Sequence, residues 1–441
     1  MDNNQKIPMK NYLTLLILVV SAAAFYQILY LRWTFYDGMM ELSGLNNTQF
    51  GLTMSVYGTM SMILYLPGGI IADKISSRIL VPVSLIVTGA AGLILMTGPG
   101  FGVQMVSYIL LAAAGTLTFW AALNKAVRNL DGGDGSRMFG LLEGGRGLAQ
   151  AAFSAIFLAV FGMCASAVGG VKAVLGGYAA LNILFGVLSF LMLEDDSKAG
   201  ASAEPLRGAD IFEIWKMPAI WLLTLVVISS YCFHLASTYL TPYFTNVIGA
   251  TAVLSGALAV VRNYIAQMAG APFGSAMAQK TGSSAFTVAC GFIAMAVGIG
   301  VVAVLPSDSG MMVPLVIFMI ISAVSIYVIR GIYFAIIGEC GIPLRLTGTA
   351  IGIVSVIGFT PDIFVSPVCG ALLDRYEGAQ GYRYIFIMML AVAVIGLISA
   401  WSLYFMSKKK KEGDLSGQRE ASHSLSVCRA DIFPDSRHLL F

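Results

Sequence analysis

Seven ionisable residues lie inside long apolar stretches of this chain, where a charge is unfavourable. They are Arg32, Glu143, Arg146, His234, Arg262, Arg330 and Asp362. A charge at the centre of a bilayer costs roughly 2.5–3.5 kcal/mol on insertion scales, so such residues generally face a cavity or a partner. The set contains four arginines against two acids. We therefore expect it to recognise an anion.

Arg262 is the deepest of the four arginines, near the middle of its apolar stretch, and is followed by Asn263 and Tyr264. A guanidinium offers five donors in a planar fork, which suits carboxylate, phosphate, sulfonate or nitrate. We predict that these three residues bind the substrate. The alternative is a structural ion pair between Arg262 and Asp362.

Arg330 lies toward the end of another stretch, with Tyr327 and Tyr333 three residues to either side. This spacing places one tyrosine near the arginine on each neighbouring helical turn. We predict a third substrate contact at Arg330. A gate residue, or an ion pair with Glu339, is the alternative.

Asp362 follows Pro361 in the middle of an apolar stretch. The proline removes one backbone donor and frees the carbonyl of Ile357, so a helix is expected to bend there. A desolvated carboxylate can take up a proton. We predict that Asp362 carries the coupling proton; the alternative is a counter-ion for Arg262 or Arg330.

Glu143 and Arg146 are three residues apart and can pair on one helix face. Glu143 is a second candidate for proton coupling, with an intrahelical pair as the alternative. His234 is a third candidate, although a single imidazole among apolar neighbours is more often a hydrogen-bonded core residue.

The surrounding chain supplies the helices that must position these residues. It has 441 residues, of which 58% are hydrophobic and 11% charged. About 20 apolar residues span a bilayer as a helix. The sequence predicts an all-α integral membrane protein with twelve transmembrane helices, over residues 12–34, 48–68, 79–98, 103–125, 139–162, 172–193, 218–240, 251–277, 285–305, 312–335, 348–370 and 384–406.

The longest internal polar stretch predicts a cytoplasmic linker over residues 194–216, between six-helix halves at 1–193 and 217–407. Residues 408–441 are polar and predicted to be a disordered cytoplasmic tail. The halves contain a faint repeat, in which residues 68–74 align with residues 274–280. We therefore expect two pseudo-symmetric halves.

Lysine and arginine are concentrated at both ends and in alternate loops. The remaining loops hold only Lys172, Arg375 and Arg383. Because short cytoplasmic loops retain basic residues, this asymmetry predicts that both termini are cytoplasmic.

One short loop between two of the predicted helices contains a motif. Gly69, Asp73, Lys74 and Arg78 match the pattern Gly-x-x-x-Asp-Arg/Lys-x-Gly-x-Arg/Lys, with Ser76 in place of the second glycine. The pattern resembles the loop between helices 2 and 3 of the major facilitator superfamily (MFS). The resemblance implies two six-helix halves, secondary transport by alternating access, and a gate in which Asp73 meets the start of helix 11.

The resemblance also suggests a substrate class. Residues 117–125 and 347–364 look like those of a bacterial subgroup of uncharacterised permeases, near the organic-anion and nitrate-type facilitators. Tyr30-Leu31-Arg32 resembles the helix 1 site at which organic-anion facilitators bind the substrate anion. This resemblance implies substrate contacts at Tyr30 and Arg32. The alternative is that the Arg32 side chain extends to the interface on the outer side of the membrane that the protein spans.

We therefore expect a multi-pass protein of the bacterial inner membrane that moves a small organic anion, by proton symport or anion exchange. Transport of nitrate or another inorganic anion, multidrug export and a sensor on a transporter fold are the alternatives. The chain shows no zinc motif, phosphate loop or nucleophile elbow, so we expect no enzyme activity, metal or cofactor. A net charge of +3 does not suggest nucleic acid binding. We expect a monomer in contact with membrane lipid.

Overall fold

The computed structural model describes residues 8–130, 136–196, 208–343 and 346–432. The regular elements in this described part are all helical. Within it, eleven helices are long and apolar enough to cross a membrane, and the bent helix α3 makes a twelfth. The predicted all-α membrane architecture is therefore confirmed, with twelve spans when the two segments of α3 count as one.

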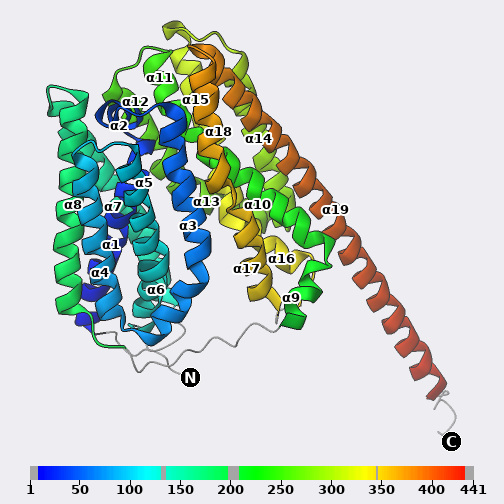
Figure 1. Cartoon of the computed structure of the whole chain (residues 1–441). Helices are drawn as coiled ribbons and strands as arrows, with labels where there is room; N and C mark the ends of the chain where they lie inside the picture. Colours follow the sequence, from blue (N-terminus) through cyan, green and yellow to red (C-terminus); the bar gives the residue numbers. More distant parts are fainter. Residues whose placement is uncertain (1–7, 131–135, 197–207, 344–345, 433–441) are drawn as a thin grey trace, which may run out of the picture.

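The first six spans lie on one side of the molecule (Figure 1). They are α1 (Met9–Tyr30) with η1 (Leu31–Trp33), α3 (Asn47–Lys74), α4 (Ser77–Met96), α5 (Phe101–Ala112) with the π-helical η2 (Ala113–Phe119) and α6 (Trp120–Asn129), α7 (Ser136–Met163) and α8 (Ala167–Met192). The short helix α2 (Tyr36–Ser43) connects the first two.

The other six spans follow α9 (Gly208–Trp215). They are α10 (Pro218–Ala236) with η3 (Ser237–Tyr239) and α11 (Leu240–Asn246); α12 (Ala252–Val260) with the π-helical η4 (Val261–Ile265) and α13 (Ala266–Thr281); α14 (Ser284–Val304); η5 (Ser309–Met311) with α15 (Met312–Ile332), η6 (Tyr333–Ala335) and α16 (Ile336–Glu339); α17 (Thr347–Gly358) with α18 (Pro361–Arg375); and α19 (Ala379–Ile432).

The two ends of the bundle differ in how the halves meet. We call the face at which α1 begins the terminal face and the opposite one the far face (Figure 1). Toward the far face, Asn246 donates to Asp37 (2.9 Å) and Thr241 donates to the carbonyl of Trp33 (2.9 Å). At the terminal face, α6 and α17 lie well apart in Figure 1. The halves are thus held together toward the far face.

The aligned glycines of the sequence repeat occupy matching places in the two halves. A Cβ atom at Gly68 would collide with the carbonyl of Thr116, and one at Gly274 would lie 2.7 Å from the carbonyl of Val328. In each half, the missing side chain therefore lets the second span approach the fourth closely. The weak sequence repeat coincides with a shared packing contact.

The end of the chain differs from the expected disordered tail. Helix α19 continues from the last membrane span to Ile432, and residues 433–441 lie outside the described part. Extending an existing helix adds one hydrogen bond per residue without a new nucleation step, and residues 408–432 contain no proline to stop it. The expectation of disorder neglected this propagation.

Candidate functional site

A carboxylate and an arginine of the second half lie together on the central, half-buried surface between the halves. Tyr231 on α10 donates to Oδ2 of Asp362 (2.9 Å). The Arg330 guanidinium lies 5.4 Å from the centre of the ring of the same Tyr231. No ion pair joins Arg330 to a carboxylate in the described part of the chain. Arg330 is therefore available to a ligand.

The helix break that positions Asp362 is the one that its proline predicts. Helix α17 ends at Gly358 and α18 begins at Pro361. The carbonyl of Ile357 accepts a hydrogen bond from Oγ1 of Thr360 (2.7 Å). The break therefore places Asp362 in the first turn of α18, and its buried Oδ1 atom has no hydrogen-bond partner among the described residues.

Aromatic rings from three helices surround the same region. Tyr30 stacks on Trp33, with ring centres 4.1 Å apart, at the end of α1. His234 contacts Trp33 edge-on at 5.2 Å and Tyr327 at 5.9 Å. His234 is 6% exposed, and among the described residues its imidazole ring makes these aromatic contacts and no hydrogen bond. Of the predicted site residues, the structure brings Tyr30, His234, Arg330 and Asp362 together here, and we call these four residues with Tyr231 the central cluster.

Arg32 lies closer to the far face, away from the central cluster. It is 2% exposed, and its Nη1 donates to the carbonyl of Phe50 (2.8 Å). Its guanidinium carbon lies 4.0 Å from the centre of the Phe50 ring, and its Nη2 has no hydrogen-bond partner in the part of the chain that the structure describes. Arg32 is therefore buried in protein and does not reach the membrane interface.

Arg262 joins the two halves at Trp33, the residue that follows Arg32. It lies on η4, is 2% exposed, and donates to the carbonyls of Ser237 (2.6 Å) and Trp33 (3.3 Å). Its neighbour Tyr264 accepts a hydrogen bond from Gln27 (2.8 Å), and the side-chain amide nitrogen of Asn263 has no hydrogen-bond partner within the described ranges. The expected alternative, a pair between Arg262 and Asp362, is not formed, because the open carbonyls at two helix ends take the guanidinium donors instead.

Glu143 and Arg146 form the ion pair that their spacing predicts, at 2.5 Å on α7. The Arg146 guanidinium lies near the rings of Tyr26 (5.9 Å) and Trp120 (5.7 Å). The pair is separate from the central cluster. Glu339, the expected alternative partner of Arg330, instead accepts hydrogen bonds from Ser283 (3.1 Å) and from the start of α14.

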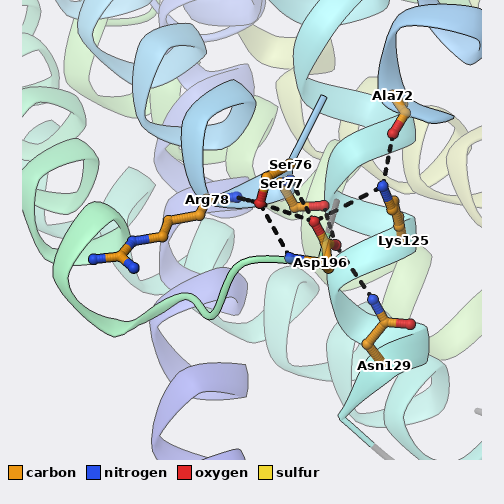
Figure 2. A network of polar contacts seen from close by, with 7 residues as sticks. All are labelled: Ala72, Ser76, Ser77, Arg78, Lys125, Asn129 and Asp196. Atoms are coloured by element: carbon orange, nitrogen blue, oxygen red, sulfur yellow. Dashed lines mark hydrogen bonds and ion pairs between the residues drawn. The ribbon is translucent and has the colours of Figure 1, made fainter. Parts of the chain in front are cut away.

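The motif between α3 and α4 has an anchor that the sequence did not reveal. Asp196, just beyond α8, accepts hydrogen bonds from the backbone and hydroxyl of Ser77 (both 2.7 Å) and from Ser76 (3.0 Å). Lys125 lies 3.8 Å from the same carboxylate and donates to the carbonyl of Ala72 (2.9 Å) (Figure 2). Asp196 therefore ties this loop to the ends of α6 and α8.

The four motif residues have different surroundings. Gly69 and Asp73 are exposed, and Asp73 makes no hydrogen bond or ion pair with the described residues. Lys74 is exposed and ends α3. Arg78 donates to the carbonyl of Phe190 (3.2 Å) and points away from the Asp196 network (Figure 2). The closely packed glycine of this segment is Gly68, the residue before Gly69.

Replacing Asp196 with alanine is expected to lower the thermal stability of the purified protein. The change leaves the buried donors of Ser76 and Ser77 unsatisfied, and one unsatisfied donor costs about 1–3 kcal/mol. Thermal unfolding in detergent measures the effect. Glu194→Ala is the matched control, because its ion pair with Lys10 is exposed and contributes little. Equal melting temperatures for the two variants would show that the network is not stabilising.

Two residues of these sites, Tyr231 and Asp196, were not predicted from the sequence. Tyr231 lies one turn before His234 on the same helix, and that spacing could have revealed it. Asp196 is one of three consecutive acids that directly follow an apolar stretch. The sequence carried no signal for which donors this acid would meet.

The comparisons with known proteins agree with this geometry. Residues 15–360 match the family model of the Major Facilitator Superfamily, so the chain belongs to that family and is a membrane transporter by fold and not an enzyme. It is 27% identical to the inner membrane protein YqcE and 28% identical to the inner membrane protein YihN, both of Escherichia coli (strain K12). The two alignments cover 90% of this chain, and 95% and 96% of the relatives.

Solved structures show the same fold. The nucleoside transporter NupG superposes with a TM-score of 0.72 over 90% of this chain and 99% of its own, at 13% identity. An inward-facing, unoccupied bacterial homologue of the human lysosomal transporter Spinster superposes with a TM-score of 0.69, over 91% and 98%, at 12% identity. At these identities, the likeness extends to the fold alone.

Proposed function

We propose that this chain is a secondary transporter that moves a small organic anion across the bacterial inner membrane by alternating access. The observation that carries the proposal is Arg330, a half-buried arginine at the central surface between the halves, with no carboxylate of the described residues at ion-pair distance. Such a fork binds a carboxylate or phosphate with two parallel hydrogen bonds. Arg330 is thus assigned to the anionic group of the substrate.

The other members of the central cluster complete this assignment. Tyr30 and Tyr231 offer hydroxyl groups and ring faces to the rest of the solute. Asp362 is the proposed proton carrier, because its unpartnered Oδ1 provides a place for a proton while Tyr231 holds Oδ2. His234 and Glu143 are secondary candidates for coupling. Binding of the anion beside Arg330 and of a proton at Asp362 would leave the site's charge unchanged.

Arg32 and Arg262 belong to a second stage of the cycle in this proposal. Arg262 now donates to the carbonyl of Trp33 across the boundary between the halves, and to the carbonyl of Ser237 within its own half. Opening of the far face must break the contact to Trp33, and the released donors would then face an entering anion. Asn263 and Tyr264 would accompany Arg262 in that state.

The proposed orientation places the terminal face and both termini in the cytoplasm. The basic residues of the terminal loops support it, since short cytoplasmic loops retain lysine and arginine. The relatives' description as inner membrane proteins supports the location. The described conformation is then inward-facing. The motif residues Gly69, Asp73, Lys74 and Arg78 form the proposed cytoplasmic gate.

Uptake into proteoliposomes tests the proposed function. Labelled mono- and dicarboxylates, sugar acids, phosphate esters and nitrate are offered with and without an inward proton gradient. We expect one organic class to accumulate, and more strongly with the gradient. Accumulation of nitrate alone would favour an inorganic anion transporter.

Export of aromatic cations is the competing class, since a carboxylate among aromatic rings also suits a cation. Cationic dyes are therefore included in the panel. Transport of dyes without any anion would overturn the organic-anion proposal. If a correctly folded preparation transports neither the anions nor the dyes, the result would favour a sensor.

A further inference from the structure

At the far face, one carboxylate of the second half binds the first turn of a helix of the first half. Oδ1 of Asp374 accepts from the backbone nitrogen (3.0 Å) and side-chain amide (2.9 Å) of Asn47. Oδ2 accepts from the backbone nitrogen (2.7 Å) and hydroxyl (2.6 Å) of Thr48. Asp374 ends span eleven and Asn47 begins span two, so these four hydrogen bonds join the halves.

The contact uses donors that a helix end always leaves open. Helix α3 begins at Asn47, and the side chain of Asn46 already caps the backbone nitrogen of Gln49. The nitrogens of Asn47 and Thr48 have no partner within the helix. A carboxylate placed at this end also meets the positive end of the helix dipole. Asp374 therefore completes the capping of α3 in the present conformation, in which the halves meet at the far face.

The sequence around Asp374 repeats the spacing of the motif at the other end of α3. Gly69-x-x-x-Asp73-Lys74 corresponds to Gly370-x-x-x-Asp374-Arg375. Each acid is the last residue but one of its helix. A Cβ atom at Gly370 would collide with the carbonyl of Asn47, so the glycine permits the close approach that the hydrogen bonds need.

We infer that Asp374 is a gating residue that holds the far face closed. Its role there would be equivalent to that of Asp73 at the terminal face. The two acids belong to the same pair of spans: Asp73 lies at the end of span two and Asp374 at the end of span eleven. Asp374 of span eleven binds the start of span two in the present state. Asp73 of span two would bind the start of span eleven, at Thr347, when the terminal face closes. The two contacts alternate, so each stabilises one end of the transport cycle. This inference rests on the proposed alternating access and does not depend on the substrate.

Cys369 provides a native reporter for opening of the far face. It lies on α18 near Asp374 and is fully buried. In a background with the other five cysteines changed to serine, an impermeant maleimide is applied to intact cells and to inverted vesicles. Asp374→Asn is expected to speed labelling of Cys369 from the far face roughly fivefold, since it removes a charged partner of a helix end. Glu377→Gln is the matched control, because it removes an exposed acid three residues away.

Asn47→Pro tests the same contact from the other partner. Proline is favoured at the first position of a helix and lacks the N–H that Asp374 accepts. We expect it to raise labelling in the same direction, and the combination with Asp374→Asn to be less than additive. Asp73→Asn is expected to slow the labelling, and its combination with Asp374→Asn to return it toward the wild-type rate.

The labelling needs no substrate, so its outcome is separate from that of the uptake assay. Unchanged labelling in Asp374→Asn, in protein that is folded by its melting temperature, would overturn the gating role. An equal increase in Glu377→Gln would also overturn it, because the effect would then follow from surface charge alone. Faster labelling confined to the variants of Asp374 and Asn47 would support it.

Discussion

Arg330→Ala is expected to abolish uptake of the organic anion while the protein still folds and reaches the membrane. The guanidinium is half-buried, lies over the Tyr231 ring and has no acidic partner at ion-pair distance in the described part of the chain. Loss of a hydrogen-bonded charge in such a place costs about 1.5–3 kcal/mol, which corresponds to a roughly 10- to 150-fold weaker interaction with the anion.

Two further substitutions define what Arg330 contributes. Arg330→Lys keeps the charge but loses the planar fork, so we expect partial recovery with a raised apparent KM. Arg383→Ala, which removes an exposed arginine of α19, is the control for a general change in charge. Wild-type uptake and affinity in Arg330→Ala would exclude Arg330 from the substrate site, and the anion contact would then have to be sought at Arg32 or Arg262.

Asp362→Asn is expected to separate transport from the proton gradient. The amide oxygen can still accept the hydrogen bond from Tyr231, so the local geometry is kept. The side chain can no longer gain and lose a proton. We expect uphill accumulation driven by an imposed proton gradient to fall at least about tenfold, the change produced by 1.4 kcal/mol, while exchange of labelled for unlabelled substrate continues.

Tyr231→Phe is the matched variant for this second prediction. It leaves the carboxyl group in place and removes its hydroxyl partner, so proton coupling should persist with altered substrate affinity. Accumulation by Asp362→Asn at the wild-type level would show that the proton is carried elsewhere, with His234 and Glu143 as the remaining candidates. Loss of both accumulation and exchange would assign Asp362 to substrate binding instead.

The number and position of the spans could be predicted because they follow from local properties of the chain. A run of apolar residues of bilayer length is sufficient to mark a helix. The break before Asp362 and the pair between Glu143 and Arg146 are also local, since each depends on residues within one turn. These parts of the prediction agree with the structure.

The partners of the buried arginines could not be predicted in the same way. Arg32 binds the carbonyl of Phe50, and Arg262 binds carbonyls at the ends of two other helices. Every residue has a backbone carbonyl, so the sequence does not mark which ones remain open. An arginine and an acid appear complementary in sequence even where helix ends compete successfully for the guanidinium.

The same limitation applies to Asp196 and Asp374. Each accepts hydrogen bonds from the start of a helix that is distant in the chain. An acid at the end of an apolar stretch resembles an ordinary solvated loop residue. Only the three-dimensional packing distinguishes a carboxylate that caps a neighbouring helix from one that faces water.

The bend in α3 determines which contacts have to be remade in each transport cycle. The segments Asn47–Tyr65 and Pro67–Lys74 meet at 55°. The longer segment packs on α18, where Ser55 donates to the carbonyl of Ile363, and the shorter one is held by Lys125 through the carbonyl of Ala72. A joint at this point would let the long segment separate from α18 of the opposite half while the short one stays fixed to α6. The Asp196 network would then persist through every turnover, and the energy barrier to transport would arise mainly from the contacts of the longer segment.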